Sequence, residues 1–129
     1  RCGTGHSVSF VGNVHEGPHA LNGRNTVVFQ PGMIVTDEPG VYEGGQVGIR
    51  IENELMCVHK ADNQYGTFLG FEPIMFVPIA TSPVVPGVLT RDELDWLNAY
   101  HREVFTKLAP RLTEEERDWL AKKCAAIGA

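Results

Sequence analysis

The sequence lacks the hallmarks of a membrane protein, a signal peptide and a nucleic-acid-binding surface. It contains no run of about 18 apolar residues, which a membrane-spanning helix needs. Its net charge is −5 and its Lys and Arg residues are scattered, which argues against nucleic acid and anionic membranes as partners. The first residues include neither an initiator Met nor the basic and apolar regions of a signal peptide, so we expect a piece of a longer protein.

Cysteine is also scarce and is not arranged in pairs. Cys2, Cys57 and Cys124 are far apart and odd in number, whereas a disulfide framework needs an even set and a thiolate zinc site favours C-x-x-C pairs. We therefore expect a reducing, cytoplasmic environment. The 129 residues, 43% of them hydrophobic, are enough for one globular domain with a core of its own.

The part of the chain up to residue 80 is rich in glycine and β-branched residues, a composition typical of strands and turns. Short apolar runs predict strands at residues 26–29, 33–36, 48–58 and 68–79. Glycine and proline predict turns at residues 30–32, 39–40 and 44–45.

From Thr90 onward the pattern becomes helical. Thr90-x-x-Glu93 and Thr113-x-x-Glu116 are capping boxes, which mark two helix starts. The apolar face predicted for the first helix, which should end before Pro110, comprises Leu94, Leu97, Tyr100, Val104, Phe105 and Leu108; that of the second comprises Trp119, Leu120 and Ala125. Residues 82–87 are expected to form an extended connector.

Strands followed by helices predict the α+β class. We expect antiparallel strands and then two C-terminal helices, with residues 1–80 as the strand-rich part and residues 81–129 as a helical extension of the same domain.

Charged residues within strand-like surroundings are the candidates for chemistry, because burying a charge is costly unless it is paired or metal-bound. Alternation places Arg50 and Glu52 on one face of their strand. Glu38 follows an apolar run, and His6 and His15 flank a glycine-containing stretch. Carboxylates with imidazole suit Mn, Co or Zn. Spacing alone leaves open a solvated face or an ion pair, since no compact signature such as H-E-x-x-H is present.

Three motifs resemble those of a known enzyme family. Residues 3–6 with 13–18, residues 31–42 and residues 48–53 resemble, in order and separation, the three signatures of the aminopeptidase P branch of the pita-bread metallopeptidases. Residues 67–74, 77–79 and 96–101 resemble the C-terminal segment of the larger cytosolic Xaa-Pro aminopeptidases. The resemblance implies the C-terminal portion of a pita-bread fold and hydrolysis of Xaa-Pro bonds by two divalent metal ions, most often manganese, with cobalt or zinc possible.

The resemblance also implies a role for each matching residue. His6 matches the single metal-binding histidine, Glu38 a metal ligand that also shuttles protons, and Glu52 the carboxylate that bridges two metals. His15 matches a catalytic histidine that contacts substrate, and Arg50 an arginine close to the bridging glutamate.

Two departures from the family pattern affect these expectations. Cys2 stands where the family usually has a histidine that lines the substrate pocket, so we expect altered substrate contacts there. The family's two aspartate ligands lie upstream of the first motif. We therefore expect this chain to be a fragment that is inactive alone, and to form a homodimer or otherwise self-associate.

Two other functions stay open at this point. The first is a prolidase-like or creatinase-like relative acting on another substrate, against which the helical tail argues. The second is a catalytically dead binding module, against which the retained ligands argue. The substrates implied by the resemblance are peptides with proline in second position. His19, His59 and His101 match no functional position, and we expect them at the surface.

Overall fold

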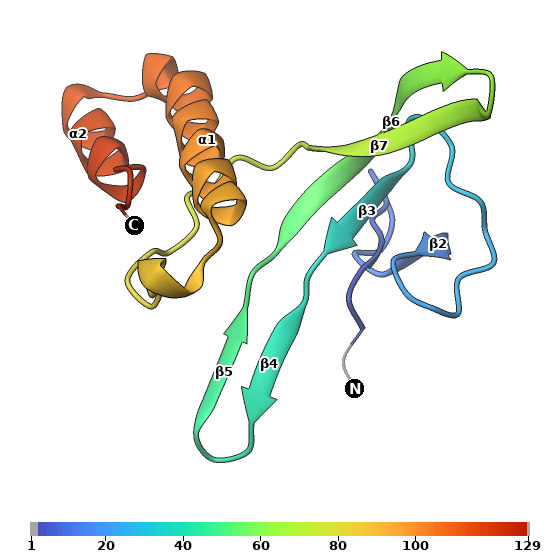
Figure 1. The fold of residues 1–129 in the computed structure, drawn as a ribbon, viewed down its shortest axis with the longest axis horizontal. Coiled ribbons are helices and arrows are strands. Elements are labelled where there is room, and N and C mark those ends of the chain that lie inside the picture. The colour runs from blue at the N-terminus through green and yellow to red at the C-terminus, as the bar shows by residue number, and fades with distance from the viewer. Residues whose placement is uncertain (1–2, 129) are drawn as a thin grey trace. The chain divides into compact units, whose positions relative to one another are not determined.

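The computed structural model describes residues 3–128, which form two compact units that divide after Met75 (Figure 1). The strands lie in the first unit and the helices in the second. This order confirms the α+β class. The functional division into residues 1–80 and 81–129 stays a prediction.

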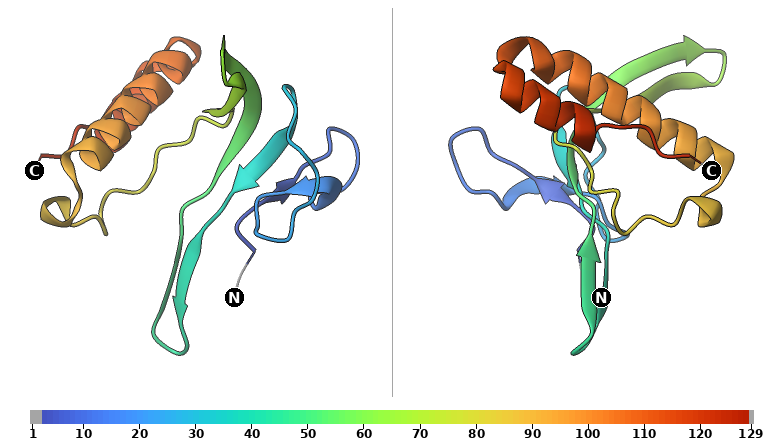
Figure 2. Two further views of the ribbon diagram at one scale, coloured as in Figure 1. Left: turned by 45° about the vertical axis from the view of Figure 1, so that its right-hand side comes forward. Right: turned by 90° about the vertical axis from the view of Figure 1, so that its left-hand side faces the viewer.

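The first unit contains a five-stranded sheet in which every pair of neighbours is antiparallel, in the order β2-β1-β3-β6-β7. Its strands are β1 (His6–Ser7), β2 (Glu16–Ala20), β3 (Ile34–Asp37), β6 (Asn53–Asn63) and β7 (Gly66–Pro73). A separate two-stranded hairpin consists of β4 (Gly40–Glu43) and β5 (Val47–Arg50). In Figure 2 this hairpin extends away from the larger sheet.

Two of the predicted turns are confirmed, and glycine makes both possible. Gly32 has a φ of 91° and Gly45 a φ of 73°, in the region that side chains disfavour. The first turn is closed by the Met33 amide donating to the Gln30 carbonyl. It leads into β3, whose Val35 is fully buried.

Several strand and turn predictions are wrong, at residues 26–29, 39–40, 48–58 and 68–79. Residues 26–29 form no strand, because the Asn25 side chain bonds to both the amide and the carbonyl of Val27. Residues 39–40 form no turn, because Gly40 is already the first residue of β4. The run 48–58 is divided between β5 and β6, with a break at residues 51–52, and the last strand ends at Pro73.

The second unit confirms both helices and both capping boxes. It comprises η1 (Pro86–Val88), α1 (Arg91–Leu108), η2 (Ala109–Arg111) and α2 (Glu114–Lys123). The buried centre consists of Tyr100, Val104 and Leu120, against which Phe76, Ile79, Phe105, Leu108, Leu112 and Cys124 pack. None of the helices described is long and apolar enough to span a membrane.

Three expectations about the second unit are wrong. Trp119 is 56% exposed and Ala125 is also exposed, so Leu120 alone of the predicted contacts of α2 is buried. Residues 82–87 include a turn and enter a 3-10 helix instead of forming an extended connector. His101 is fully buried instead of lying at the surface, and its Nε2 accepts a hydrogen bond of 3.1 Å from the Ile79 amide.

Candidate metal centre

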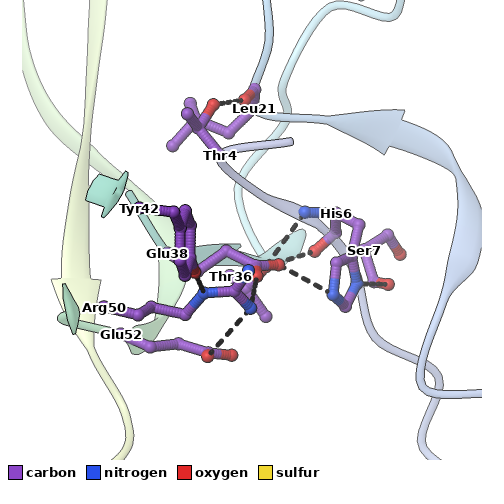
Figure 3. Close-up of polar contacts among 9 residues, drawn as sticks. All are labelled: Thr4, His6, Ser7, Leu21, Thr36, Glu38, Tyr42, Arg50 and Glu52. Atoms are coloured by element: carbon purple, nitrogen blue, oxygen red, sulfur yellow. Dashed lines mark hydrogen bonds and ion pairs between the residues drawn. The ribbon is translucent and has the colours of Figure 1, made fainter. Parts of the chain in front are cut away.

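The candidate site lies where three segments of the first unit meet. His6 is on β1, Glu38 directly follows β3, and Arg50 and Glu52 lie at and just after the end of β5 (Figure 3). Antiparallel pairing of β1 with β3 joins the first two segments, while the hairpin places Gly40 opposite Arg50. Residues separated by up to 46 positions in sequence thereby come into one cluster.

A close backbone crossing holds the segment of His6 against that of Glu38. The Glu38 amide donates to the Thr4 carbonyl at 2.8 Å. A Cβ atom at Gly5 would lie only 1.9 Å from the Thr36 carbonyl oxygen, a distance that no side chain tolerates. Glycine at position 5 is therefore a condition for this approach.

Glu38 is the centre of the polar network. Its side chain is only 9% exposed, so its charge requires partners. One carboxylate oxygen, Oε1, lies 3.0 Å from His6 Nε2 and accepts a hydrogen bond of 3.0 Å from the Thr36 hydroxyl. The other, Oε2, accepts a hydrogen bond of 2.6 Å from Arg50 Nη1.

The His6 ring is oriented for ligation through Nε2. Its Nδ1 lies 2.9 Å from the Ser7 carbonyl oxygen. A neutral ring with its proton on Nδ1 keeps the Nε2 lone pair for a metal, the arrangement typical of metal-binding histidines. The exposed His15 ring lies beside it, with 4.3 Å between the ring centroids. The structure thus brings His15 next to the candidate ligand.

Arg50 is held between the two carboxylates by Tyr42. Its Nη1 lies 4.0 Å from Glu52 Oε2, in addition to its bond to Glu38. Its Nε donates to the Tyr42 hydroxyl at 2.8 Å, and this hydrogen bond is the main cause that raises the pKa of Arg50 above its usual value. Sequence reasoning missed Tyr42, although it occurs in the second motif.

Two glycines make room for the Tyr42 ring. A Cβ at Gly40 would lie 2.6 Å from the Tyr42 hydroxyl oxygen, and one at Gly48 would lie 2.9 Å from its Cδ1. Because both glycines lack side chains, the ring can lie across the hairpin and present its hydroxyl to Arg50.

The residues fit one part of a divalent metal site. Neighbouring ligands of an ion bound at about 2.1 Å lie about 3 Å apart, and His6 Nε2 and Glu38 Oε1 are 3.0 Å apart. Within residues 3–128 no group of three His, Cys, Asp or Glu residues could hold a metal ion. Glu52 is 4.0 Å from Arg50 and completes no such group. The donor chemistry suits Mn, Co or Zn.

The remaining sequence-based expectations have mixed outcomes. Cys2 lies outside the described residues. His59 is exposed as expected and pairs with Asp62 at 2.8 Å. His19 is buried instead of lying at the surface, and its Nε2 is 2.6 Å from the Ile34 carbonyl oxygen. The burial of His19 follows from the pairing of β2 with β1, so no local sequence pattern predicts it.

Comparison with known proteins identifies the family. Residues 1–59 match the model of metallopeptidase family M24, and residues 67–127 match that of the C-terminal region of peptidase M24. Among curated proteins, aminopeptidase P2 of Arabidopsis thaliana is 47% identical over 127 residues, or 93% of this chain and 18% of the relative. A probable Xaa-Pro aminopeptidase P of Coprinopsis cinerea is 42% identical over 98% of this chain and 22% of its own length.

A solved structure agrees with these matches. The X-prolyl aminopeptidase of Caenorhabditis elegans, described as a cytosolic enzyme with a di-nuclear active site, superimposes with a TM-score of 0.84 and 39% identity. The match covers 97% of this chain and 21% of that protein, so the chain spans about a fifth of the length of these relatives. The fold is the C-terminal portion of the pita-bread fold, and the chain belongs to metallopeptidase family M24.

Proposed function

We propose that the protein carrying this chain is a metal-dependent Xaa-Pro aminopeptidase, which releases an N-terminal residue from a following proline. The observation that carries the proposal is the convergence of His6, Glu38 and the Arg50–Glu52 pair in one cluster. The family membership and the names of the relatives support the same activity.

In this proposal His6, Glu38 and Glu52 hold metal, together with ligands from outside this chain. The chemistry supplied by two bound divalent cations, manganese by preference, is polarisation of the scissile carbonyl and acidification of water. Glu38 takes a proton from water and delivers it to the prolyl nitrogen of the leaving group. Arg50 orients the two carboxylates, and His15 contacts substrate beside His6.

Proline explains why a dedicated site is needed. The nitrogen of the scissile bond belongs to the proline ring and carries no hydrogen, so an enzyme must recognise the ring instead of an N–H donor. Cys2, at the position where the family has a pocket histidine, contacts substrate in this proposal. The substrates are peptides with proline second; we propose no nucleic-acid or membrane partner.

Two further features belong to the proposal. A cytoplasmic location is supported by the C. elegans relative, which is described as cytosolic. Self-association, as a homodimer or otherwise, is supported by apolar side chains that lie exposed on the β4–β5 hairpin and the loop before β2, namely Val41, Val47, Ile49, Phe10, Val11 and Val14.

The test is a substrate comparison with the full-length protein loaded with Mn²⁺. We expect release of the first residue from an Xaa-Pro-Xaa tripeptide, and no release when alanine replaces the proline. Cleavage of Xaa-Pro dipeptides alone would indicate a prolidase-like enzyme. Loss of all cleavage in a folded, metal-loaded protein would indicate a binding module, and either result would overturn the proposal.

A further inference from the structure

Thr36 connects the two candidate ligands that lie closest together. It is 3% exposed and belongs to β3, two residues before Glu38. Its hydroxyl oxygen accepts a hydrogen bond of 3.0 Å from the His6 amide. The same oxygen lies 3.0 Å from Glu38 Oε1, to which it donates. One buried hydroxyl thus touches both the backbone of His6 and the carboxylate of Glu38.

The hydroxyl proton has a preferred direction. A threonine hydroxyl has a single proton to donate, and two acceptors are within reach, Glu38 Oε1 at 3.0 Å and the His6 carbonyl oxygen at 3.4 Å. The carboxylate is the nearer acceptor and is charged, so it receives the stronger bond. The hydroxyl oxygen also accepts the His6 amide hydrogen, which polarises the O–H bond and strengthens its donation to Glu38.

The consequence for Glu38 is a fixed orientation of its carboxylate. Thr36 holds Oε1 and Arg50 holds Oε2, so neither oxygen is able to rotate away. His6 is fixed in turn by its amide bond to Thr36 and its ring bond to Ser7. The contacts of both residues with their neighbours therefore set the distance of 3.0 Å between His6 Nε2 and Glu38 Oε1.

We propose that Thr36 is a positioning residue, which uses its hydroxyl to keep His6 and Glu38 at the separation that one metal ion requires. This inference rests on the proposed metallopeptidase function but adds a residue to which neither the motifs nor the relatives' names give a role. Partners of this kind commonly change metal affinity by about 10-fold to 100-fold when removed.

The experiment measures Mn²⁺ binding by calorimetry in the full-length protein and three variants. Thr36→Val keeps the shape and removes the hydroxyl, while Thr36→Ser keeps the hydroxyl. Thr67→Val is the matched control, because the Thr67 hydroxyl donates to Asp62 at an exposed hairpin. We expect a dissociation constant about 10-fold to 100-fold higher for Thr36→Val only, with Thr36→Ser and Thr67→Val close to wild type.

The outcomes separate this inference from the proposed function. Equal Mn²⁺ affinity in Thr36→Val and wild type would overturn it. An equal loss of affinity in Thr36→Ser would also overturn it, because serine keeps the hydroxyl to which the effect is assigned. Thermal unfolding checks each variant, and Thr36→Ala replaces Thr36→Val if the latter does not fold. A wild-type protein that binds Mn²⁺ but leaves Xaa-Pro peptides intact refutes only the proposed function.

Discussion

At the scale of single residues, Glu38 has closely constrained surroundings. Its carboxylate is enclosed by His6, Thr36 and Arg50, each within hydrogen-bonding distance. A carboxylate held in this way has one orientation available, which favours a role that requires exact placement, such as ligation combined with proton transfer. The Glu52 side chain is 41% exposed and lies 4.0 Å from Arg50 Nη1. Its orientation is therefore less fixed by neighbouring residues than that of Glu38.

A change of Glu38 to Gln tests the role in proton transfer. In the full-length protein, Glu38→Gln should lower kcat far more than it raises KM, because the lost interaction occurs mainly in the transition state. Glu43→Gln, on the exposed hairpin, is the control and should leave both constants unchanged. An effect of Glu38→Gln on KM alone would mean that Glu38 only holds substrate.

The candidate site residues could be nominated from the sequence, whereas much of their surroundings could not be predicted. Motif order was sufficient to nominate His6, Glu38 and Glu52. Thr36 and Tyr42 emerge only when strands meet, because β1 pairs with β3 and the β4–β5 hairpin folds the ring over two glycines. Contacts between residues distant in sequence leave no local pattern to read.

At the scale of elements, local signals predicted the structure well and tertiary contacts decided the rest. Both helices begin where their capping boxes indicate, because a cap satisfies amides within one turn of chain. The predicted strand at 26–29 failed where a side chain of the neighbouring residue satisfied the backbone locally. Apolar character alone also misplaced Trp119, whose neighbour Leu120 is the residue that α2 buries.

A pair of adjacent truncations in α2 tests this packing. Leu120 is 2% exposed and lies in the buried centre of the second unit, whereas Trp119 is largely exposed. Leu120→Ala should lower the free energy of unfolding by about 2–5 kcal/mol. Trp119→Ala removes more atoms but should cost less, as measured by denaturant unfolding. A larger loss for Trp119→Ala would mean that the helix presents the other face to its core.

His101 gives the second unit a predicted dependence on pH. Burial lowers the pKa of His101 below its usual value of 6.5. The unfolded chain therefore binds a proton more readily, and stability should fall as the pH decreases through 6.5 toward the folded pKa. The limiting slope is about 1.4 kcal/mol per pH unit.

The measurement is denaturant unfolding between pH 8 and about pH 5, a range that spans the ordinary histidine pKa. His101→Gln keeps a hydrogen-bonding side chain but does not titrate, so its stability should decline less over the range. His59→Gln, at an exposed position, is the control and should follow wild type. Equal slopes for His101→Gln and wild type would contradict the assignment.

On the scale of the whole molecule, no three His, Cys, Asp or Glu residues within residues 3–128 form a group that could hold a metal ion. The larger sheet has two edge strands, β2 and β7. We expect the 129-residue chain alone to hydrolyse no Xaa-Pro peptide and to bind at most one Mn²⁺ weakly. Uncovered edges and apolar side chains favour self-association, which sedimentation over a range of concentrations would detect. Peptide hydrolysis by the purified chain would show that the site is misplaced.

We propose that His6, Glu38 and Glu52, together with further residues of the full-length protein, are ligands of a two-metal site. The most direct test is the manganese content of the full-length protein after dialysis, compared with that of Glu52→Gln. We expect two ions per full-length chain for the wild type and at least one fewer for the variant. Two ions retained by a folded Glu52→Gln protein would contradict it.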